Sequence, residues 1–304
     1  MPAEQRLNGW LVIDKPSGVT SNRVVERVRR ATGSKAGHAG TLDPLATGVL
    51  PIALGEATKT VAYAMNGPKH YRFRIRWGVA RNTDDSAGEM VGESSSRPEP
   101  AAIEAMLPRF TGAIMQTPPA FSAIKIDGRR AYALARSDRS PSLTARRVEI
   151  ASLQLIATPD ADHADCEAVV GKGTYIRALV RDLAQALNTL GHVAALRRLS
   201  VGRFTEAQAI SLESVSDPQH IPITCGRLLP IEAALDGIPA VTLSAAEANR
   251  LRCGQSVALG GSHERAAIEG LDAGTVVSAW RDRILVALAR VEDGGLRPLR
   301  VINW

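Results

Sequence analysis

The segment from Tyr71 to Trp77 has the clearest alternation of apolar and polar residues in the chain. Its apolar members would lie on one face of a β-strand, with three arginines between them on the other face. We therefore predict a strand with one face in the core and a basic face towards solvent.

Two segments have the period of an amphipathic helix. One is predicted over residues 21–33, where Thr20 or Ser21 can cap the start of the helix and Gly33 ends it. The other runs from Thr174 to Leu190, with one apolar stripe that stops at a glycine. On its flank Arg177 and Arg181 are four residues apart, so they point the same way.

The remaining pattern indicates a mixed α/β chain with two domains. Ser244 and Glu247 form a capping box for a helix that ends at Arg252, and a further helix is expected near residues 101–109. Residues 158–165 are polar and turn-like. We expect one domain over residues 1–225 and a small, β-rich domain over residues 226–304. The other predicted strands are 10–14, 49–54, 147–157, 167–170, 276–280, 284–291 and 299–302.

The segment from Ser34 to Gly48 has neither period, and its glycines and proline predict a structured loop. Pro44 biases Asp43 towards an extended backbone, so the loop can present one carboxylate rigidly at the mouth of a cleft. From the residues alone, Asp43 is a catalytic group, a helix cap or a turn-stabilising side chain. No Gly-Lys-Ser/Thr sequence follows, which disfavours a phosphate-binding loop.

The net charge of +6 is unevenly distributed. Residues 1–203 carry 28 Lys and Arg against 19 Asp and Glu, whereas residues 204–304 carry 9 against 12. Of the 37 basic residues 31 are arginine, whose forked guanidinium suits phosphate. The segment 120–147 concentrates basic residues among Gly, Ser and Pro. This favours a polyanion bound by the first two thirds of the chain, although a GC-rich genome would also enrich arginine.

The cysteines Cys166, Cys225 and Cys253 are far apart, with no Cys-x-x-Cys pair and no adjacent histidines. We expect reduced thiols, no disulfide framework and no bound metal. The N-terminus does not resemble a signal peptide, and apolar runs such as 284–289 are too short to span a bilayer. A cytoplasmic protein without membrane contact is expected.

The most specific motif is Gly-His-x-Gly-x-Leu-Asp-Pro-x-Ala-x-Gly, from Gly37 to Gly48. With the motifs around it, the chain resembles the TruB family of bacterial tRNA pseudouridine-55 synthases over about residues 9–203. Asn82 and Ala87 stand where that family usually has aspartates, and Gly171 where it has Ser or Cys, which affects local turn geometry. Beyond residue 203 the likeness rests on position and a β-like pattern. The other motifs are Asp14-Lys15-Pro16-Ser17-Gly18 with Ser21-Asn22, Leu54 to Lys59, Tyr71-Arg72, Asp85 to Gly88, Ser122 to Lys125, Lys172 to Arg177, and Leu196 to Leu199.

The resemblance implies an α/β (α+β) fold with a mixed, mostly antiparallel central sheet and flanking helices, followed by a small β-rich, PUA-like domain. The implied reaction isomerises uridine 55 in the T loop of tRNA to pseudouridine. This chemistry consumes no redox equivalent or phosphate energy, and the family needs no cofactor or metal. The expected partner is the T arm of tRNA, bound by a monomer that requires no protein partner.

The resemblance also assigns roles to single residues. Asp43 is the catalytic aspartate, which attacks C1′ or removes a sugar proton, and Arg177 keeps it ionised. Tyr71 stacks on the uracil and helps to remove the C5 proton. The implied substrate-binding residues are His38, Tyr175, Leu196, Asp85 and Lys15. The implied RNA-binding residues, in a thumb-like insertion near residues 120–147, are Lys125, Arg129, Arg130, Arg146 and Arg147.

Each assigned residue also has an ordinary structural interpretation. Tyr71 and Leu196 suit core positions, and Asp85 suits a turn before a glycine. His38 could be a hydrogen-bonding loop residue, and Arg177 a solvated or phosphate-binding helix arginine.

Three other functions compete with the isomerase. The basic body would suit an RNA-binding or tRNA-folding chaperone, which would not need the loop around Asp43. A guide-RNA-dependent pseudouridine synthase is disfavoured by the short acidic C-terminal module and the absence of lysine-rich tails. A glycosidase is disfavoured because only one strong candidate carboxylate is evident, whereas most glycosidases use two.

Overall fold

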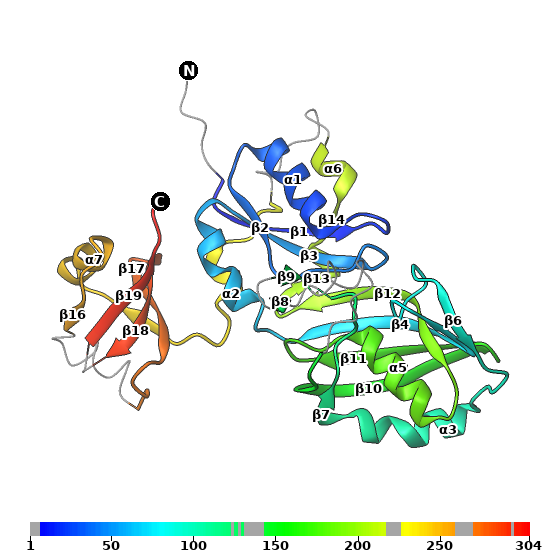
Figure 1. Ribbon diagram of the computed structural model, residues 1–304. Helices are drawn as coiled ribbons and strands as arrows, with labels where there is room; N and C mark the ends of the chain where they lie inside the picture. The colour runs from blue at the N-terminus through cyan, green and yellow to red at the C-terminus, as the bar shows by residue number, and fades with distance from the viewer. Residues whose placement is uncertain are drawn as a thin grey trace.

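The computed structural model describes residues 7–122, 125–126, 129–130, 143–216, 226–258, 270–292 and 295–304, with only the backbone of 125–126 and 129–130. Its main feature is a ten-stranded sheet (Figure 1). The strands of this sheet are β1 (Gly9–Lys15), β2 (Ala36–His38), β3 (Thr47–Leu54), β4 (Lys69–Trp77), β7 (Gly112–Gln116), β10 (Arg146–Asp160), β11 (His163–Val170), β12 (Gly191–Val201), β13 (Phe204–Thr205) and β14 (Ile210–Ser211).

The strands of the large sheet follow the order β14-β1-β3-β12-β4-β11-β10-β7, with β2 beside β3 and β13 beside β12. Only the β1–β14 and β3–β12 pairs are parallel. The prediction of a mixed, mostly antiparallel sheet with flanking helices is confirmed. The helices are α1 (Ser21–Thr32), α2 (Val61–Ala64), α3 (Pro100–Met106), α5 (Ile176–Ala186), α6 (Leu212–Ser216) and α7 (Ala245–Arg252), with 3₁₀ turns η1 (Gly55–Thr60), η2 (Leu107–Phe110), η3 (Glu206–Gln208) and η4 (Ile231–Ala234).

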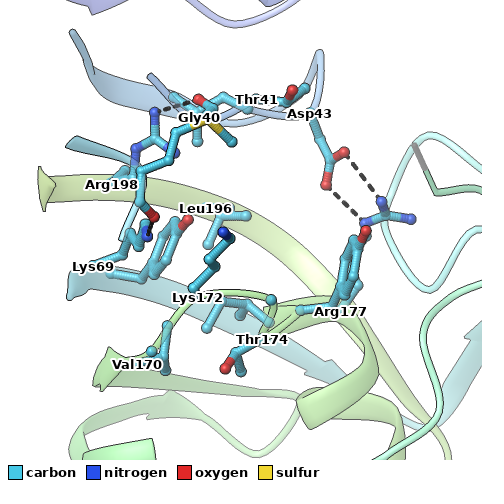
Figure 2. A pocket seen from close by; sticks show the side chains of 17 residues that line it. Gly40, Thr41, Asp43, Lys69, Val170, Lys172, Thr174, Arg177, Leu196 and Arg198 are labelled. Atoms are coloured by element: carbon cyan, nitrogen blue, oxygen red, sulfur yellow. Dashed lines mark hydrogen bonds and ion pairs between the residues drawn. The ribbon is translucent and has the colours of Figure 1, made fainter. Parts of the chain in front are cut away.

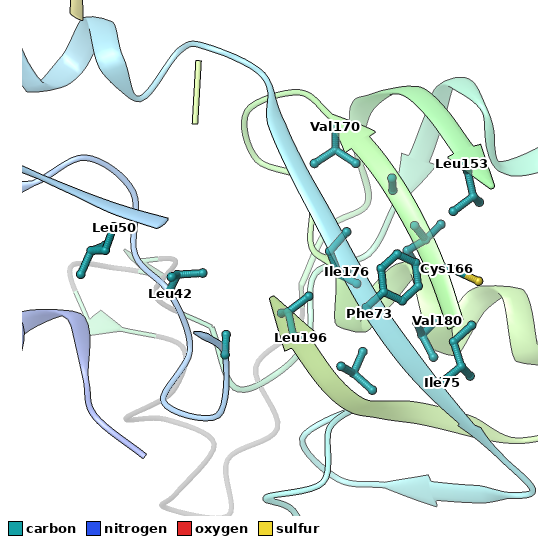
Figure 3. Close-up of a cluster of buried hydrophobic side chains, with 14 of the residues drawn as sticks. Leu42, Leu50, Phe73, Ile75, Leu153, Cys166, Val170, Ile176, Val180 and Leu196 are labelled. Atoms are coloured by element: carbon teal, nitrogen blue, oxygen red, sulfur yellow. The ribbon is translucent and has the colours of Figure 1, made fainter. Parts of the chain in front are cut away.

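The main core lies between the sheet and helices α1, α3 and α5. Figure 3 shows part of it, in which Phe73 and Ile75 of β4 pack with Ile176 and Val180 of α5 and with Cys166 of β11. Because successive strand residues face opposite sides, β4 needs an apolar residue at every second position to contribute to this layer. Burial of the Cys166 thiol raises its pKa to about 12, as expected for a reduced core cysteine.

The outward face of β4 carries the predicted arginines, and their charges are paired. Arg74 forms a two-pronged ion pair with Asp165, at 2.7 and 2.8 Å, and Arg72 pairs with Glu167 at 2.6 Å. Both acids belong to the neighbouring strand β11, which is antiparallel and in register with β4. The face is therefore largely neutralised by cross-strand pairs.

Several element boundaries also differ from the predictions. Strands β10 and β11 leave only residues 161–162 as a turn, where 158–165 looked turn-like. Helix α5 is shorter than expected at both ends, because Tyr175 before it has an extended backbone (φ −111°, ψ 118°) and Asn188 after it has a left-handed one (φ +54°). Strand β12 was not predicted. It is a central strand with charged residues that bind neighbouring loops, so its composition lacks a clean alternation.

A second, five-stranded sheet in the order β15-β17-β18-β19-β16 forms a small β-rich unit, as predicted. Its Leu285, Leu288 and Ile302 join Trp10 and Val12 of β1 in a shared apolar cluster. Residue 225, where we divided the chain, lies outside the described residues, so that division stays a prediction. These strands are β15 (Ala240–Thr242), β16 (Val257–Ala258), β17 (Val276–Arg281), β18 (Ile284–Glu292) and β19 (Gly295–Val301). Two short hairpins are β5 (Val79–Arg81) with β6 (Met90–Glu93) and β8 (Lys125–Ile126) with β9 (Arg129–Arg130).

Within the described residues, no helix combines the length and apolar character needed to cross a bilayer.

Candidate active site

The loop that carries Asp43 joins β2 to β3 and is fixed from two sides. Ser21, at the start of α1, accepts a hydrogen bond from the backbone N–H of Leu42 at 2.9 Å and donates to its carbonyl at 3.0 Å. The ammonium of Lys15 donates to the Pro44 carbonyl at 3.1 Å. These contacts on both flanks of Asp43 hold the loop against β1 and α1, so its carboxylate has a defined position.

The carboxylate of Asp43 forms a two-pronged ion pair with Arg177 of α5. Arg177 Nε lies 2.8 Å from Asp43 Oδ2, and Nη2 lies 3.1 Å from Oδ1 (Figure 2). Only 3% of the Arg177 side chain is exposed, against 31% of Asp43. A buried guanidinium that binds both oxygens holds the carboxylate in a defined orientation, and the carboxylate remains partly accessible.

The rest of the Arg177 guanidinium is also bound. Nη1 donates to the Thr83 carbonyl at 2.9 Å, and Nη2 donates to the Phe121 carbonyl at 3.0 Å. Asp85 Oδ2 lies 3.6 Å from Nε and is almost fully buried. The other oxygen of Asp85 accepts from Thr83 Oγ1 at 2.6 Å and from the Ala87 N–H at 3.0 Å. Asp85 is thus both a turn residue and a neighbour of Arg177.

A pocket of about 280 Å³ opens beside this ion pair. Tyr71 of β4 lines it together with Leu196 of the adjacent strand β12. Tyr175, which precedes α5, completes the group of predicted residues around Asp43 and Arg177. The structure therefore brings together three predicted catalytic residues and two predicted substrate-binding residues that are up to 153 positions apart in the chain.

Three basic residues that were not among the predicted site residues also line the pocket: Lys69, Lys172 and Arg198. Figure 2 shows Arg198 and Lys69 at the end away from the Asp43–Arg177 pair. Burial, followed by the charges of the nearby Arg198 and Lys172, lowers the pKa of Lys69 to about 8. Lys69 lies two positions before Tyr71 in β4 and therefore shares its inward face. This spacing is the feature of the sequence from which Lys69 could have been predicted as a pocket residue. The other two lie inside motifs quoted above.

Arg198 also holds the loop that carries Asp43. Its side chain is 1% exposed, and it donates to the Gly40 carbonyl at 2.9 Å and to the Val49 carbonyl at 2.8 Å. A guanidinium can bind two carbonyls at once because its donors form a rigid fork. Arg198 thereby ties β12 to both ends of the loop.

Three predicted substrate-binding residues lie outside the pocket lining: Asp85, whose contacts are given above, Lys15 and His38. Lys15 is fully buried, and its ammonium donates to the carbonyls of Pro16, Val19 and Pro44 at 2.7–3.1 Å. His38 lies in β2, and burial followed by the charge of Arg198 lowers the pKa of its imidazole. Within the described part of the chain, His38 Nδ1 is buried without a hydrogen-bond partner. A direct substrate contact stays a prediction for all three residues.

The predicted RNA-binding arginines differ in their surroundings. Arg146 lies over the ring of Tyr175, with its guanidinium carbon 5.3 Å from the ring centroid, and donates to the Gly173 carbonyl. Arg147, the next residue, is exposed on β10. The side chains of Lys125, Arg129 and Arg130 lie outside the described residues.

The arrangement suits chemistry at a sugar carbon. An ionised carboxylate beside an aromatic pocket can act as a nucleophile or a base at a glycosidic bond. The other carboxylate near Arg177, Asp85, does not line the pocket, and its Oδ1 is bound within its own turn. Among the described residues, the pocket therefore offers one carboxylate to a substrate, whereas most glycosidases use two.

Comparisons with known proteins agree with this geometry. The family model of the TruB pseudouridylate synthase N-terminal domain matches residues 28–176, and that of the tRNA pseudouridylate synthase B C-terminal domain matches residues 177–236. A Rhodospirillum rubrum protein named tRNA pseudouridine synthase B is 52% identical, over 98% of this chain and 97% of its own length. A Caulobacter vibrioides protein of the same name is 50% identical, over 98% and 96%.

Among solved structures, a chain of an H/ACA ribonucleoprotein bound to a substrate RNA containing 2′-deoxyuridine has a TM-score of 0.73. The two chains are 23% identical, and the match covers 97% of this chain and 85% of that one. This similarity concerns the fold. The family models and the full-length relatives show that the chain belongs to the TruB family of pseudouridylate synthases.

Proposed function

We propose that this chain is a tRNA pseudouridine synthase that isomerises uridine 55 in the T loop of tRNA. The observation that carries the proposal is the two-pronged Asp43–Arg177 ion pair at the edge of a pocket lined by Tyr71. The names of the 50–52% identical relatives support tRNA as the substrate class. The T arm as binding partner, a monomeric protein and a cytoplasmic location belong to the same proposal.

The reaction breaks the bond from C1′ to N1 of uracil, turns the base, and joins C1′ to C5. N1 gains a proton and C5 loses one, so atoms and electrons balance without a cofactor. Asp43 attacks C1′ or removes a sugar proton, and both routes require the ionised carboxylate that Arg177 stabilises. The uridine must leave its stack to enter the pocket, where Tyr71 and Tyr175 offer flat surfaces to the base.

The positions of Lys15 and Arg146 suggest roles other than those we expected from the sequence. Since all three polar contacts of the Lys15 ammonium go to backbone carbonyls, we assign it to support of the Asp43 loop. Arg146 is assigned to support of Tyr175, because its guanidinium lies over that ring. Arg147 is exposed and keeps the proposed contact with RNA phosphate.

The proposal is tested with the purified full chain and a tRNA transcript that carries tritium at C5 of its uridines. Formation of pseudouridine releases that tritium, and chemical mapping locates the product. We expect about one equivalent of tritium per transcript, product only at position 55, and no release from a transcript with cytidine at that position. Product at other uridines alone would contradict the T-loop assignment.

Asp43→Asn separates the enzyme from a chaperone. The substitution removes the carboxylate charge, and we expect no tritium release but tRNA binding close to that of the wild type, because one charge is lost from a large basic surface. Turnover by this variant would overturn the catalytic role of Asp43. Activity of the purified chain alone would also separate it from a guide-RNA-dependent enzyme.

A further inference from the structure

A second arginine–aspartate pair lies one helical turn beyond the catalytic pair. Arg181 of α5 places Nη1 2.8 Å from Asp84 Oδ2, and its Nη2 donates to the Thr117 carbonyl at 2.7 Å. Its Nε donates to the adjacent Asp182 at 3.0 Å. The side chains of Arg181 and Asp84 are 24% and 14% exposed, so this is not a loosely held surface pair.

The two arginines bind neighbouring acids on a single turn. Asp84 has a left-handed backbone (φ +59°), which lets consecutive carboxylates diverge, so that Asp84 reaches Arg181 and Asp85 approaches Arg177. The Asp84 carbonyl accepts from the Val193 N–H at 3.1 Å, which ties the turn to β12. Burial raises the pKa of the Asp84 carboxyl, and the Arg181 guanidinium opposes that shift.

The same helix end also holds the segment that leads from β7 into the basic insertion. The buried Gln116 side chain donates to the Tyr175 carbonyl at 3.1 Å and accepts from the Tyr175 N–H at 2.8 Å. Thr117 is bound by Arg181 and Phe121 by Arg177, both through their carbonyls. Residues 116–121 are thus attached at three points to the segment from Tyr175 to Arg181.

We propose that Arg181 and Asp84 are positioning residues for the catalytic ion pair, an inference that rests on the proposed function. They fix the turn that contains Thr83 and the 116–121 segment that contains Phe121. The carbonyls of Thr83 and Phe121 orient the guanidinium of Arg177. With both carbonyls in place, Nε and Nη2 face the two oxygens of Asp43. If either carbonyl moves, the guanidinium rotates and one of the two bonds to the carboxylate is lost.

Arg181 could instead be an RNA phosphate ligand, and the two roles differ in what they change. A phosphate ligand affects tRNA affinity and its salt dependence. A positioning residue affects the rate at which bound tRNA reacts. Because the contacts of Arg181 described above already engage Nε, Nη1 and Nη2, the geometry favours positioning.

The first experiment measures single-turnover tritium release at saturating enzyme, with the dissociation constant for tRNA measured separately. Asp84→Asn is the main variant, because asparagine tolerates a left-handed backbone and only the charge is removed. Arg181→Gln and Arg181→Lys test the partner. Arg203→Gln is the matched control, since Arg203 forms a 2.8 Å pair with Asp236 in which both side chains are more than half exposed.

We expect Asp84→Asn and Arg181→Gln each to slow the reaction of bound tRNA about tenfold, as for a lost charge-assisted hydrogen bond. The double variant should be no slower than the slower single variant, because both remove one pair. Arg181→Lys should recover part of the rate, since its ammonium can still pair with Asp84. Arg203→Gln should react at the wild-type rate. A wild-type rate in Asp84→Asn, or a loss that lies entirely in tRNA affinity, would overturn the proposal.

A second readout does not require catalysis. In the free protein, the Arg177 Nε–H that binds Asp43 should be protected from hydrogen exchange in NMR spectra, and Asp84→Asn should reduce that protection while the thermal unfolding temperature stays within a few degrees. Unchanged protection would contradict the positioning role. A wild-type protein that forms no pseudouridine would refute the proposed function, and the exchange measurement would still decide the role of Asp84.

Discussion

The guanidinium of Arg146 lies over the ring of Tyr175, 5.3 Å from guanidinium carbon to ring centroid, at the edge of the pocket that contains Asp43. Its Nη2 also donates to the carbonyl of Gly173, the residue that follows the exposed Lys172. Two adjacent arginines in the basic segment therefore have different surroundings, because Arg146 faces the pocket wall and Arg147 faces solvent.

This difference predicts different effects of the two alanine substitutions. Arg146→Ala removes a cation–π contact of about 0.5–1 kcal/mol, so bound tRNA should react about two- to fivefold more slowly. Arg147→Ala should instead weaken tRNA binding and reduce the slope of log affinity against log salt by about one. Single-turnover rates and binding titrations at several salt concentrations measure both. Equal effects of the two variants on the rate would contradict the assignment.

Gly48, at the end of the loop that carries Asp43, is a position where a side chain would disturb the structure. Its backbone is left-handed (φ +97°), and a Cβ there would lie 2.2 Å from the Arg198 carbonyl oxygen. Gly18 is the matched control, since it is also left-handed (φ +79°) but has no atom within 4 Å of an added Cβ.

We expect Gly18→Ala to lower the free energy of unfolding by about 1–2 kcal/mol, the cost of the backbone conformation alone. Gly48→Ala should lower it by more and should also slow the reaction of bound tRNA, because β3 must move away from β12 and carry the Asp43 loop with it. Denaturant unfolding and single-turnover assays compare the two. Similar stability of both variants would show that the contact with Arg198 relaxes without cost.

Lys69 makes a prediction about pH. Burial, together with Arg198 and Lys172, lowers its pKa in the folded protein to about 8, while the unfolded chain keeps a value near 10.5. Between these values the unfolded state binds the extra proton, so a rise in pH favours the folded state.

The difference in unfolding free energy between the wild type and Lys69→Met should therefore increase in favour of the wild type from about pH 8 to about pH 10. Denaturant titrations of both proteins across this range measure it. The comparison cancels other titrating groups, including Lys15, whose pKa is also lowered to about 8 by burial. Parallel curves would indicate that Lys69 keeps an ordinary pKa in the folded protein.

Local sequence signals were sufficient wherever neighbouring residues alone decide the conformation. Thr20 caps α1 by accepting from the Arg23 N–H, and Gly33 ends it with a left-handed backbone, as the sequence predicts. The alternation in β4 correctly identifies its buried face, because side chains on a strand point to opposite sides in turn. The motif around Asp43 likewise determined the family and the expected catalytic group.

The tertiary structure decided which charges are free and which are already paired. No local pattern shows that Arg74 of β4 meets Asp165 of β11, because that pairing depends on strand order and register. The same holds for Arg177, which meets Asp43 across 134 residues, and for the fully buried Lys15. The sequence does not show whether a charged side chain faces solvent, a phosphate or a carboxylate. Only the packing of distant segments distinguishes these environments.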